Sequence, residues 1–281
     1  MMLCGGPNQR SDFHINEGEE LFFMIKGNMV LNVVERGKYR SIPIQQGQML
    51  LLPPCVPHSP QRTADSIGFV FERERLPKEI DCLRWYFPSD GLNEKRSSQQ
   101  LLPLPVKENI LYEEFFHCTD LGTQLKPIIE RFNCLELNPR QIQSQTVQPT
   151  DTIAIDETVR VVSARDVSEL MTEAARLFAE SGSMSGIDLL RLKADTSSDG
   201  KAHEFSCEAF LGTCKGHAAR SAPECIVWCI TGEAKIDTTK SVNVNVKAGD
   251  IVRIELPVES PANVISSNSD TALIVVSNSI H

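Results

Sequence analysis

Short apolar runs separated by turn residues dominate the N-terminal part of the chain. Residues 20–75 contain ELFFMIKG, MVLNVVERG, SIPIQQGQMLLLPP and SIGFVFERE, which are rich in β-branched and aromatic residues. Turn-forming residues separate these runs: Gly27, Gly37, Gly47, Pro53 and Pro57. Strands at this pitch are typical of a β-sandwich or β-barrel. The pattern therefore predicts a mainly β domain over residues 1–87.

Two later segments have a helical period instead. Over residues 167–181, VSELMTEAARLFAES places apolar residues at i, i+3, i+4, i+7, i+10 and i+11, counted from Val167. This spacing forms one apolar stripe on a helix, and Gly182 follows where a C-terminal cap belongs. A shorter helix is predicted over residues 120–132, with Asp120 as its N-cap.

Polar, proline-containing segments surround the first helix. Residues 88–107, with the sequence PSDGLNEKRSSQQLLPLPVK, are polar and interrupted by prolines. This composition predicts an exposed loop. Residues 134–162 are rich in Gln, Pro and Thr and predict a connector. We therefore interpret residues 88–162 as an insertion, a helix and a linker.

The chain returns to a β pattern from residue 187, and this half echoes the first. CIVWCITGEAKID resembles ELFFMIKGNMVLN, with Gly232 in the place of Gly27. Further on, Glu259-Ser-Pro stands where the first copy has His58-Ser-Pro. The echo predicts a second β domain over residues 163–281. The predicted fold is thus mainly β, with two barrel or jelly-roll domains and a few short helices.

Composition narrows the functional classes. The 281 residues include 28 Lys and Arg against 37 Asp and Glu, a formal net charge of −9. An acidic chain is a poor nucleic-acid partner, because phosphate contacts need clustered cations. No apolar run approaches the ~18 residues of a membrane span, and MMLCGGPNQR does not read as a secretory signal. Nine scattered cysteines without a CxxC pair favour reduced thiols and a cytosolic location.

Two spaced motifs suggest chemistry in the first domain. The first consists of His14, one residue, Asn16, three residues, Glu20, six residues and Gly27. It fits the first cupin motif, except that Asn16 stands where a second histidine is usual.

The second motif runs from Gly47 through five residues to Pro53, then Cys55, two residues, His58, three residues and Arg62. It keeps the spacing of the second cupin motif and changes two identities. Because two independently spaced motifs agree, we predict an N-terminal metal-binding cupin and a degenerate C-terminal one.

The combined motifs supply His14, Glu20 and His58 as candidate metal ligands. The even separation of His14 and Glu20 predicts one face of a strand, unless a break near Gly18 intervenes. Two histidines and one carboxylate leave positions open, as in non-haem Fe(II) oxygenases. Singly, each has a plainer interpretation, such as a core or turn histidine, or a solvated carboxylate beside Glu17.

Longer stretches of the chain resemble the 3-hydroxyanthranilate 3,4-dioxygenase family of the animal type. The similar stretches are GGPNQRSDFHINEGEELFF, LLPPCVPHSPQR, GFVFERERL and DLGTQL, in this order. The resemblance implies a bicupin fold, Fe(II) as cofactor, and ring opening of 3-hydroxyanthranilate by O₂. It also implies the product 2-amino-3-carboxymuconate semialdehyde, which closes to quinolinate, a precursor of NAD in the kynurenine pathway of tryptophan catabolism.

The resemblance also assigns site residues. It implies iron ligation by His14, Glu20 and His58, and substrate contacts from Glu20, Arg62 and Glu72. Arg62 lies four residues after His58 and could share its face, where a guanidinium suits the substrate carboxylate.

The remaining pocket residues are Arg10 and Glu72. The resemblance implies that Arg10, four residues before His14, faces dioxygen, and that Glu72 accepts a proton or hydrogen bond from the substrate. The alternatives are a surface cation for either arginine, and for Glu72 a salt bridge to Arg73 or Arg75.

Some expectations concern departures from the family. Animal members carry further residues before GGPN, so the N-terminal cupin is expected to be short, and residues 88–107 resemble an insertion. Cys225 and Cys229 form a CxxxC without a second pair, so the extra Cys-ligated iron of bacterial relatives is not expected. His217 and Glu224 miss the ligand spacing, so we expect one iron per chain.

Two rival functions remain open. One is another cupin metalloenzyme, such as a thiol dioxygenase or a sugar isomerase. The other is a cupin binding or storage protein without metal chemistry. The expected partners are a small aromatic acid and O₂, with no nucleic acid and no membrane, in a monomer or homodimer.

Overall fold

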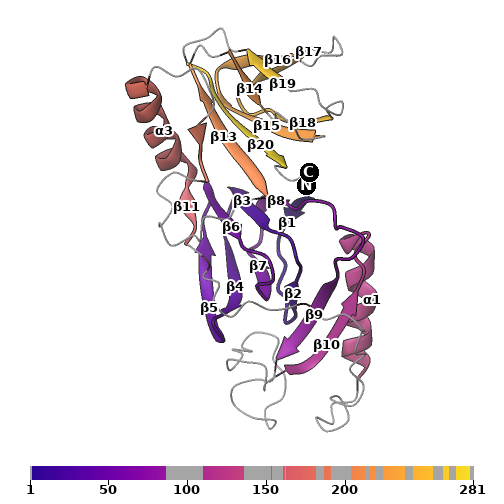
Figure 1. Cartoon of the computed structure of the whole chain (residues 1–281). Coiled ribbons are helices and arrows are strands. Elements are labelled where there is room, and N and C mark those ends of the chain that lie inside the picture. The colour runs from indigo at the N-terminus through magenta and orange to yellow at the C-terminus, as the bar shows by residue number, and fades with distance from the viewer. Residues whose placement is uncertain are drawn as a thin grey trace. The chain divides into compact units, whose positions relative to one another are not determined.

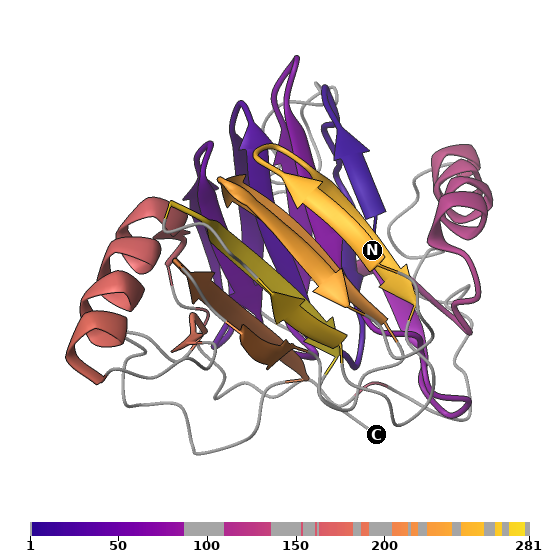
Figure 2. The same ribbon diagram turned by 90° about the horizontal axis from the view of Figure 1, so that it is seen from above.

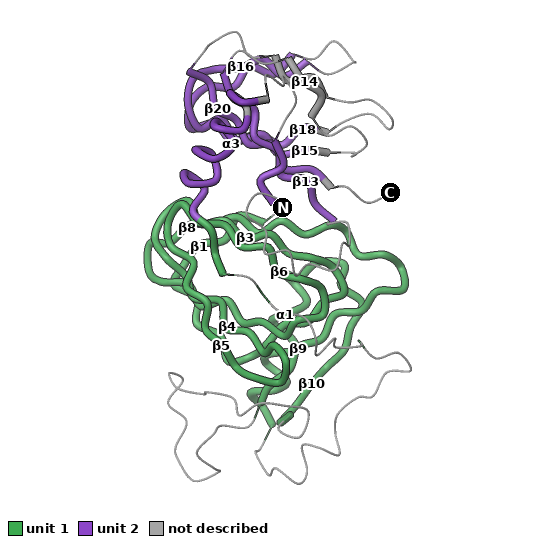
Figure 3. Tube along the Cα trace, turned by 60° about the vertical axis from the view of Figure 1, so that its left-hand side comes forward, with its two compact units in different colours: residues 1–165 green, residues 166–281 purple. Residues whose placement is uncertain are grey.

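The computed structural model describes residues 2–86, 110–135, 153, 161, 163–181, 187–190, 204–212, 215–218, 224–237, 243–255, 262–265 and 270–278. The chain divides into two compact units, residues 1–165 and 166–281 (Figure 3). The predicted loop over 88–107, most of the connector over 134–162, Gly182 and Glu259 lie outside the described residues. The predicted boundaries at residues 87 and 162 therefore stay predictions.

Two sheets build the first unit (Figure 1). The five-stranded sheet has the order β1 (Met2–Gly5), β8 (Ile67–Phe71), β3 (Glu20–Lys26), β6 (Gln48–Leu52) and β11 (Arg165–Asp166). The six-stranded sheet has the order β10 (Ile110–Phe116), β9 (Asp81–Tyr86), β2 (Phe13–Ile15), β7 (His58–Arg62), β4 (Met29–Glu35) and β5 (Lys38–Ile44).

The core of the first unit lies between these sheets. Strand β4 alternates buried and half-buried positions, as a strand with one covered face does. Its buried side chains pack with those of β3 and β6 from the other sheet, namely Met29, Leu31, Val33, Phe22, Met24, Leu50 and Leu52. The turn from β3 to β4 needs glycine, because Gly27 has φ +68° and a Cβ there would lie 3.0 Å from the Cα of Ser66.

Helix α1 (Leu121–Cys134) confirms the helix predicted over 120–132. The Asp120 carboxylate accepts a hydrogen bond from the Gly122 N–H at 3.1 Å, so Asp120 is the N-cap. The buried face of the helix packs on β9 and β10, where the rings of Phe132 and Trp85 stack at 4.2 Å. This packing covers β9, which carries one of the residues described below.

The second unit also has two sheets. Its five-stranded sheet has the order β12 (Ile187–Asp188), β13 (Phe205–Leu211), β20 (Ala272–Asn278), β15 (Glu224–Thr231) and β18 (Ile251–Glu255). Its other sheet has the order β14 (Lys215–Ala218), β19 (Ala262–Ile265), β16 (Glu233–Asp237) and β17 (Asn243–Lys247).

Helix α3 (Val167–Ser181) confirms the second predicted helix and lies near β13 (Figure 2). The helix buries Val167, Leu170 and Ala174, three members of the predicted apolar stripe. Among the described residues, no helix combines the length and apolar character needed to cross a membrane. Strands dominate both units, so the prediction of a mainly β chain with few helices is confirmed.

Candidate metal centre

His14, Glu20 and His58 meet inside the first unit. His14 on β2 and His58 on β7 are directly paired across two antiparallel strands. Glu20 opens β3 in the facing sheet. The three residues are almost fully buried, and each offers a ligand atom within 4.8 Å of the others. Their arrangement can hold a metal ion.

The route by which Glu20 reaches the histidines differs from the one-strand prediction. Strand β2 ends at Ile15, and the chain then crosses to the other sheet before Glu20 begins β3. The break near Gly18 that the sequence analysis allowed for is therefore present, and His14 and Glu20 do not share one strand face. They converge because the two sheets face each other across the core.

Each histidine uses one ring nitrogen for a protein contact and turns the other toward Glu20. Nδ1 of His58 lies 2.9 Å from the carbonyl oxygen of Val56, and its Nε2 lies 3.2 Å from Glu20 Oε1. Nε2 of His14 lies 2.7 Å from Asp81 Oδ2, and its Nδ1 lies 3.7 Å from the same Glu20 oxygen. Two nitrogens and one carboxylate oxygen thus converge on one point.

The first-motif asparagine has a different use from the histidine it replaces. Asn16 Nδ2 donates a hydrogen bond of 2.8 Å to Glu20 Oε1. Asn16 is 1% exposed, so this bond is shielded from water. It holds the carboxylate of Glu20 toward the two histidine rings.

Burial and charge oppose each other at these three groups. Burial raises the pKa of Glu20, but the charge of His58 and a hydrogen bond from it outweigh burial and lower the pKa to about 2. Burial lowers the pKa of His58, and the charge of Glu20 more than restores it, so the net shift is upward. Burial lowers the pKa of His14 despite its bond to Asp81. The metal-free site therefore favours an ionised Glu20 and a neutral His14.

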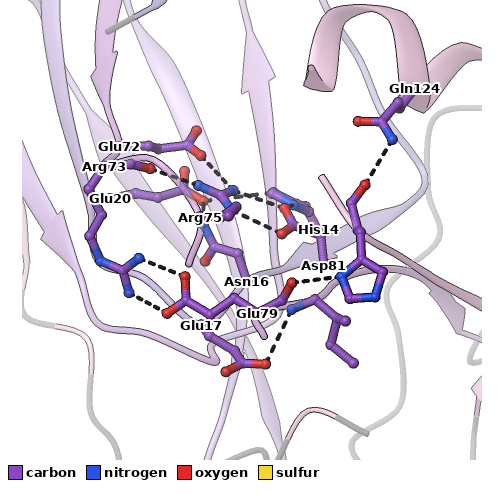
Figure 4. A network of polar contacts seen from close by, with 12 residues as sticks. His14, Asn16, Glu17, Glu20, Glu72, Arg73, Arg75, Glu79, Asp81 and Gln124 are labelled. Atoms are coloured by element: carbon purple, nitrogen blue, oxygen red, sulfur yellow. Dashed lines mark hydrogen bonds and ion pairs between the residues drawn. The ribbon is translucent and has the colours of Figure 1, made fainter. Parts of the chain in front are cut away.

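A second layer of ion pairs surrounds His14 (Figure 4). Arg75 donates to both oxygens of Asp81, from Nε at 2.9 Å and from Nη2 at 2.8 Å. The same Nη2 lies 2.7 Å from Oε2 of Glu72. Sequence reasoning missed Asp81, an acidic residue that belongs to neither of the two spaced motifs.

Glu72 forms a salt bridge with Arg75, one of the two arginines that the alternative interpretation of this residue named. Burial, then the charge of Glu20, raise the pKa of Glu72 to about 7, against the opposing effects of Arg75 and His58. Glu72 is therefore electrostatically coupled both to the ligand Glu20 and to the outer arginine.

The two arginines of the motif region have different partners. Arg62 is 6% exposed, and its Nε is buried without a hydrogen-bond partner among the described residues. Strand β7 runs unbroken from His58 to Arg62, so pleat alternation places the two on one face. Arg10 is held by both carboxylate oxygens of Asp12, and it lies close enough to Arg62 to influence its pKa.

The chain resembles proteins of known activity. Residues 1–133 match the family model described as 3-hydroxyanthranilic acid dioxygenase. The chain is 44% identical over 161 residues to 3-hydroxyanthranilate 3,4-dioxygenase of Mus musculus, covering 55% of this chain and 50% of that protein. It is 40% identical over 196 residues to the enzyme of the same name from Rattus norvegicus, covering 70% and 60%. The chain therefore spans about half to three fifths of the length of these relatives.

A solved structure supports the fold. Salicylate 1,2-dioxygenase from Pseudaminobacter salicylatoxidans aligns with a TM-score of 0.51 at 12% identity, over 98% of this chain and 69% of that protein. At this identity the likeness concerns the fold alone. Together with the paired sheets, it confirms a mainly β cupin fold.

Proposed function

We propose that the chain, whose residues 1–133 match the 3-hydroxyanthranilic acid dioxygenase family model, cleaves the ring of 3-hydroxyanthranilate with O₂. The observation that carries this proposal is the convergence of His14, Glu20 and His58 beside a buried, incompletely paired Arg62. The product would be 2-amino-3-carboxymuconate semialdehyde, which closes to quinolinate on the route to NAD.

The donor set fits Fe(II). Two imidazole nitrogens and one carboxylate form the ligand set of many non-haem Fe(II) oxygenases, and they leave coordination positions open. When bound, the iron would hold the adjacent amine and hydroxyl of the substrate and activate O₂. Asn16 supports the set by orienting Glu20, and the burial of all three residues excludes bulk water.

Arg62 supports recognition of an aromatic acid. A buried guanidinium with an unsatisfied Nε is costly unless an anion pairs with it. The carboxylate of 3-hydroxyanthranilate is such an anion, and a planar guanidinium can bind it through two hydrogen bonds. Because Arg62 shares a strand face with His58, it would orient the ring relative to the metal.

Glu72 is the proposed proton acceptor for the substrate hydroxyl or amine. A carboxylate with a pKa of about 7 can both take up and release a proton near neutral pH. Arg75 holds this carboxylate at 2.7 Å and so limits its rotation. Glu72 would therefore receive a proton in a fixed direction.

Arg10 is the proposed dioxygen-side residue. Its guanidinium is held by Asp12, and a reciprocal pair of bonds ties its backbone to Gln61 at 3.0 and 2.9 Å. This support keeps a positive charge near Arg62. We further propose a cytosolic monomer or homodimer whose partners are this small acid and O₂.

The test is an absorbance assay on purified chain loaded with Fe(II) under anaerobic conditions. Addition of 3-hydroxyanthranilate and air should produce the absorbance of the semialdehyde, followed by its decay as quinolinate forms. Iron-free protein should be inactive and should regain activity on Fe(II) addition. Undiminished turnover by chelator-treated protein would contradict the proposal.

A further inference from the structure

The side-chain amide of Gln61 holds the backbone of Arg10 at two points. Gln61 Oε1 accepts a hydrogen bond from the Arg10 N–H at 3.0 Å, and Nε2 donates to the Arg10 carbonyl at 2.9 Å. Nε2 also donates to Ser59 Oγ at 2.9 Å. The amide therefore has one fixed orientation, because its donor and its acceptor each face a partner of the opposite kind.

The strand pairing explains why a side chain is needed at this place. Asn8 and Arg62 exchange two backbone hydrogen bonds, of 3.1 and 2.8 Å, in an antiparallel bridge. In a regular antiparallel ladder the next hydrogen-bonded pair lies two residues further along each strand, which would join Arg10 to Pro60. Proline has no N–H, so Pro60 cannot donate to the Arg10 carbonyl. The amide of Gln61 supplies a donor and an acceptor instead.

The ladder resumes at the pair of His14 and His58, in a different register. From the preceding bridge to this pair, the chain advances six residues on the N-terminal side and four along β7. The N-terminal segment therefore contains a bulge, and Arg10 lies within it. Bulges redirect side chains and are common beside functional sites. In such a bulge, the Gln61 amide replaces regular strand pairing as the support of Arg10.

We propose that Gln61 is a positioning residue for the dioxygenase reaction and that it acts through Arg10. This inference rests on the dioxygen-side role of Arg10 in the proposed function. Asp12 binds the Arg10 guanidinium with both carboxylate oxygens, but Asp12 belongs to the same bulge. The ion pair would therefore move together with the segment, and it cannot replace the support from Gln61.

A second glutamine with similar contacts provides a matched control. Gln124 Nε2 donates to the His117 carbonyl at 2.9 Å, and its Oε1 accepts from the Thr119 N–H at 2.7 Å, beside the start of α1. Gln61→Met and Gln124→Met each remove a donor and an acceptor from backbone groups and keep an unbranched side chain. Only Gln61→Met removes the support of Arg10, so the control accounts for a general loss of stability.

The first measurement is amide hydrogen exchange by NMR on the full, metal-free chain. In Gln61→Met the Arg10 N–H should exchange at least about 10-fold faster than in the unaltered chain, because it loses the Gln61 acceptor. Exchange of the Asn8 N–H should change less, since its acceptor is a backbone carbonyl. Gln124→Met should leave the Arg10 rate unaltered. An unchanged Arg10 rate in Gln61→Met would overturn the inference, whatever the activity.

The unaltered chain provides a test that needs no variant to fold. A nuclear Overhauser contact should join the side-chain amide hydrogens of Gln61 to the N–H of Arg10. Its absence from spectra in which both signals are assigned would overturn the inference.

The second measurement is steady-state kinetics of the Fe(II)-loaded chain with O₂ as the varied substrate. Gln61→Met should lower kcat/KM for O₂ by up to about 100-fold, the cost of misplacing a reacting-site group by about 1 Å. The anaerobic affinity for 3-hydroxyanthranilate should change much less, and Gln124→Met should match the unaltered enzyme. Equal losses in Gln61→Met and Gln124→Met would overturn the inference.

A double-mutant cycle tests whether Gln61 acts through Arg10. Gln61→Met should have little further effect on kcat/KM for O₂ when it is added to Arg10→Ala, because the group that it positions is already lost. Additive losses would overturn the inference while leaving the proposed function intact. Lack of turnover by the unaltered, iron-loaded chain would instead reject the proposed function.

Discussion

The two units share a strand order and differ in what their strands carry. Without the added edge strands, the sheets of the first unit run β1-β8-β3-β6 and β2-β7-β4-β5. Those of the second run β13-β20-β15-β18 and β14-β19-β16-β17, which is the same order. The turn glycines also match, with φ of +68° at Gly27 and +70° at Gly232. The sequence echo between the two halves therefore reflects a shared topology.

Strand register fixes which positions correspond. Leu31 lies four residues after the first turn glycine, and Ile236 lies four residues after the second. Their partners on the adjacent strand are Pro60 and Val264. These pairs align β7 with β19 residue by residue.

The same register places alanines at the histidine positions. His58 lies two residues before Pro60, and Ala262 lies two residues before Val264, so Ala262 stands at the position of His58. His58 pairs with His14, whereas Ala262 pairs with Ala218. Since alanine offers no ligand atom, the second unit has no counterpart of this histidine pair at its matching positions.

The carboxylates are replaced as well. Met24 pairs with Gly68 in the first unit, and at the equivalent place in the second unit Cys229 pairs with Leu273. Counting four residues back along β3 and β15 matches Glu20 with Cys225. Counting four residues forward from Gly68 and Leu273 matches Glu72 with Ser277. Cys225 lies in the apolar core of its unit, among Phe210, Val227 and Ile254. The second unit shows that this fold forms with apolar or small residues at these positions. The histidines and carboxylates of the first unit are therefore required for the candidate metal centre, not for the fold.

This register revises one detail of the sequence comparison. Alignment of the Ser-Pro pairs placed Glu259 opposite His58, but the register puts Ala262 there, and Glu259 lies outside the described residues. His217 pairs with Asn263 and corresponds to Phe13, one position away from the ligand. A shift of one residue in a strand turns a side chain to the other face.

His58→Ala should have the largest effect, because it makes the first unit resemble the second. We expect loss of detectable dioxygenase activity and of stable iron binding, since two ligands remain. Metal analysis of the unaltered, loaded protein should approach one Fe per chain. His217→Ala is the matched control and should leave iron content unchanged. A second equivalent that survives in His58→Ala would break the comparison by revealing another site.

Glu72→Gln should have the next largest effect. Gln cannot accept the proton that Glu72 is proposed to take, so kcat should fall by about 10²–10⁴-fold, the usual contribution of a positioned acid or base. KM should change much less, because Gln keeps the size of the side chain. Ser277→Ala, at the matching position of the other unit, should leave kcat unaltered. Equal kcat in Glu72→Gln and the unaltered enzyme would exclude the proton-acceptor role.

Arg62→Ala should have a moderate effect that depends on the substrate. A hydrogen bond to a charged group contributes about 1.5–3 kcal/mol, so kcat/KM for 3-hydroxyanthranilate should fall roughly 10–200-fold. With 2-aminophenol, which lacks the carboxylate, the loss should be much smaller. An equal loss with both substrates would show that Arg62 does not bind the carboxylate.

The sequence predicted most of the fold and the three converging residues, but not the side chains that surround them. Periodicity located both described helices, and motif spacing selected the three residues that converge. It did not show that Glu20 comes from the facing sheet, because strand parity gives no information across a crossing between sheets. Asp81 was missed for a similar reason, since the pairing of β9 with β2 depends on contacts 67 residues apart.

The smallest expected effect concerns the stability of the metal-free chain. It tests whether the ionised Glu72 side chain lowers the free energy of unfolding of the first unit. Burial and Glu20 raise the pKa of Glu72 from 4.5 to about 7, so the folded chain holds this proton more tightly than the unfolded chain. Between pH 4.5 and 7 the Glu72 contribution to the free energy of unfolding should fall as pH rises, by at most about 3 kcal/mol. Glu72→Gln, like the serine of the second unit, does not titrate, so it should gain stability relative to the unaltered chain across this interval. Urea unfolding in chelator at several pH values measures the difference in the free energy of unfolding.

Glu79→Gln is a control in which the pKa shift has the opposite sign. The hydrogen bond from Arg73 lowers the pKa of Glu79 against the effect of burial. The difference in the free energy of unfolding between Glu79→Gln and the unaltered chain should therefore stay constant above pH 5. A pH-independent difference for Glu72→Gln would show that ionising this carboxylate costs the first unit no stability.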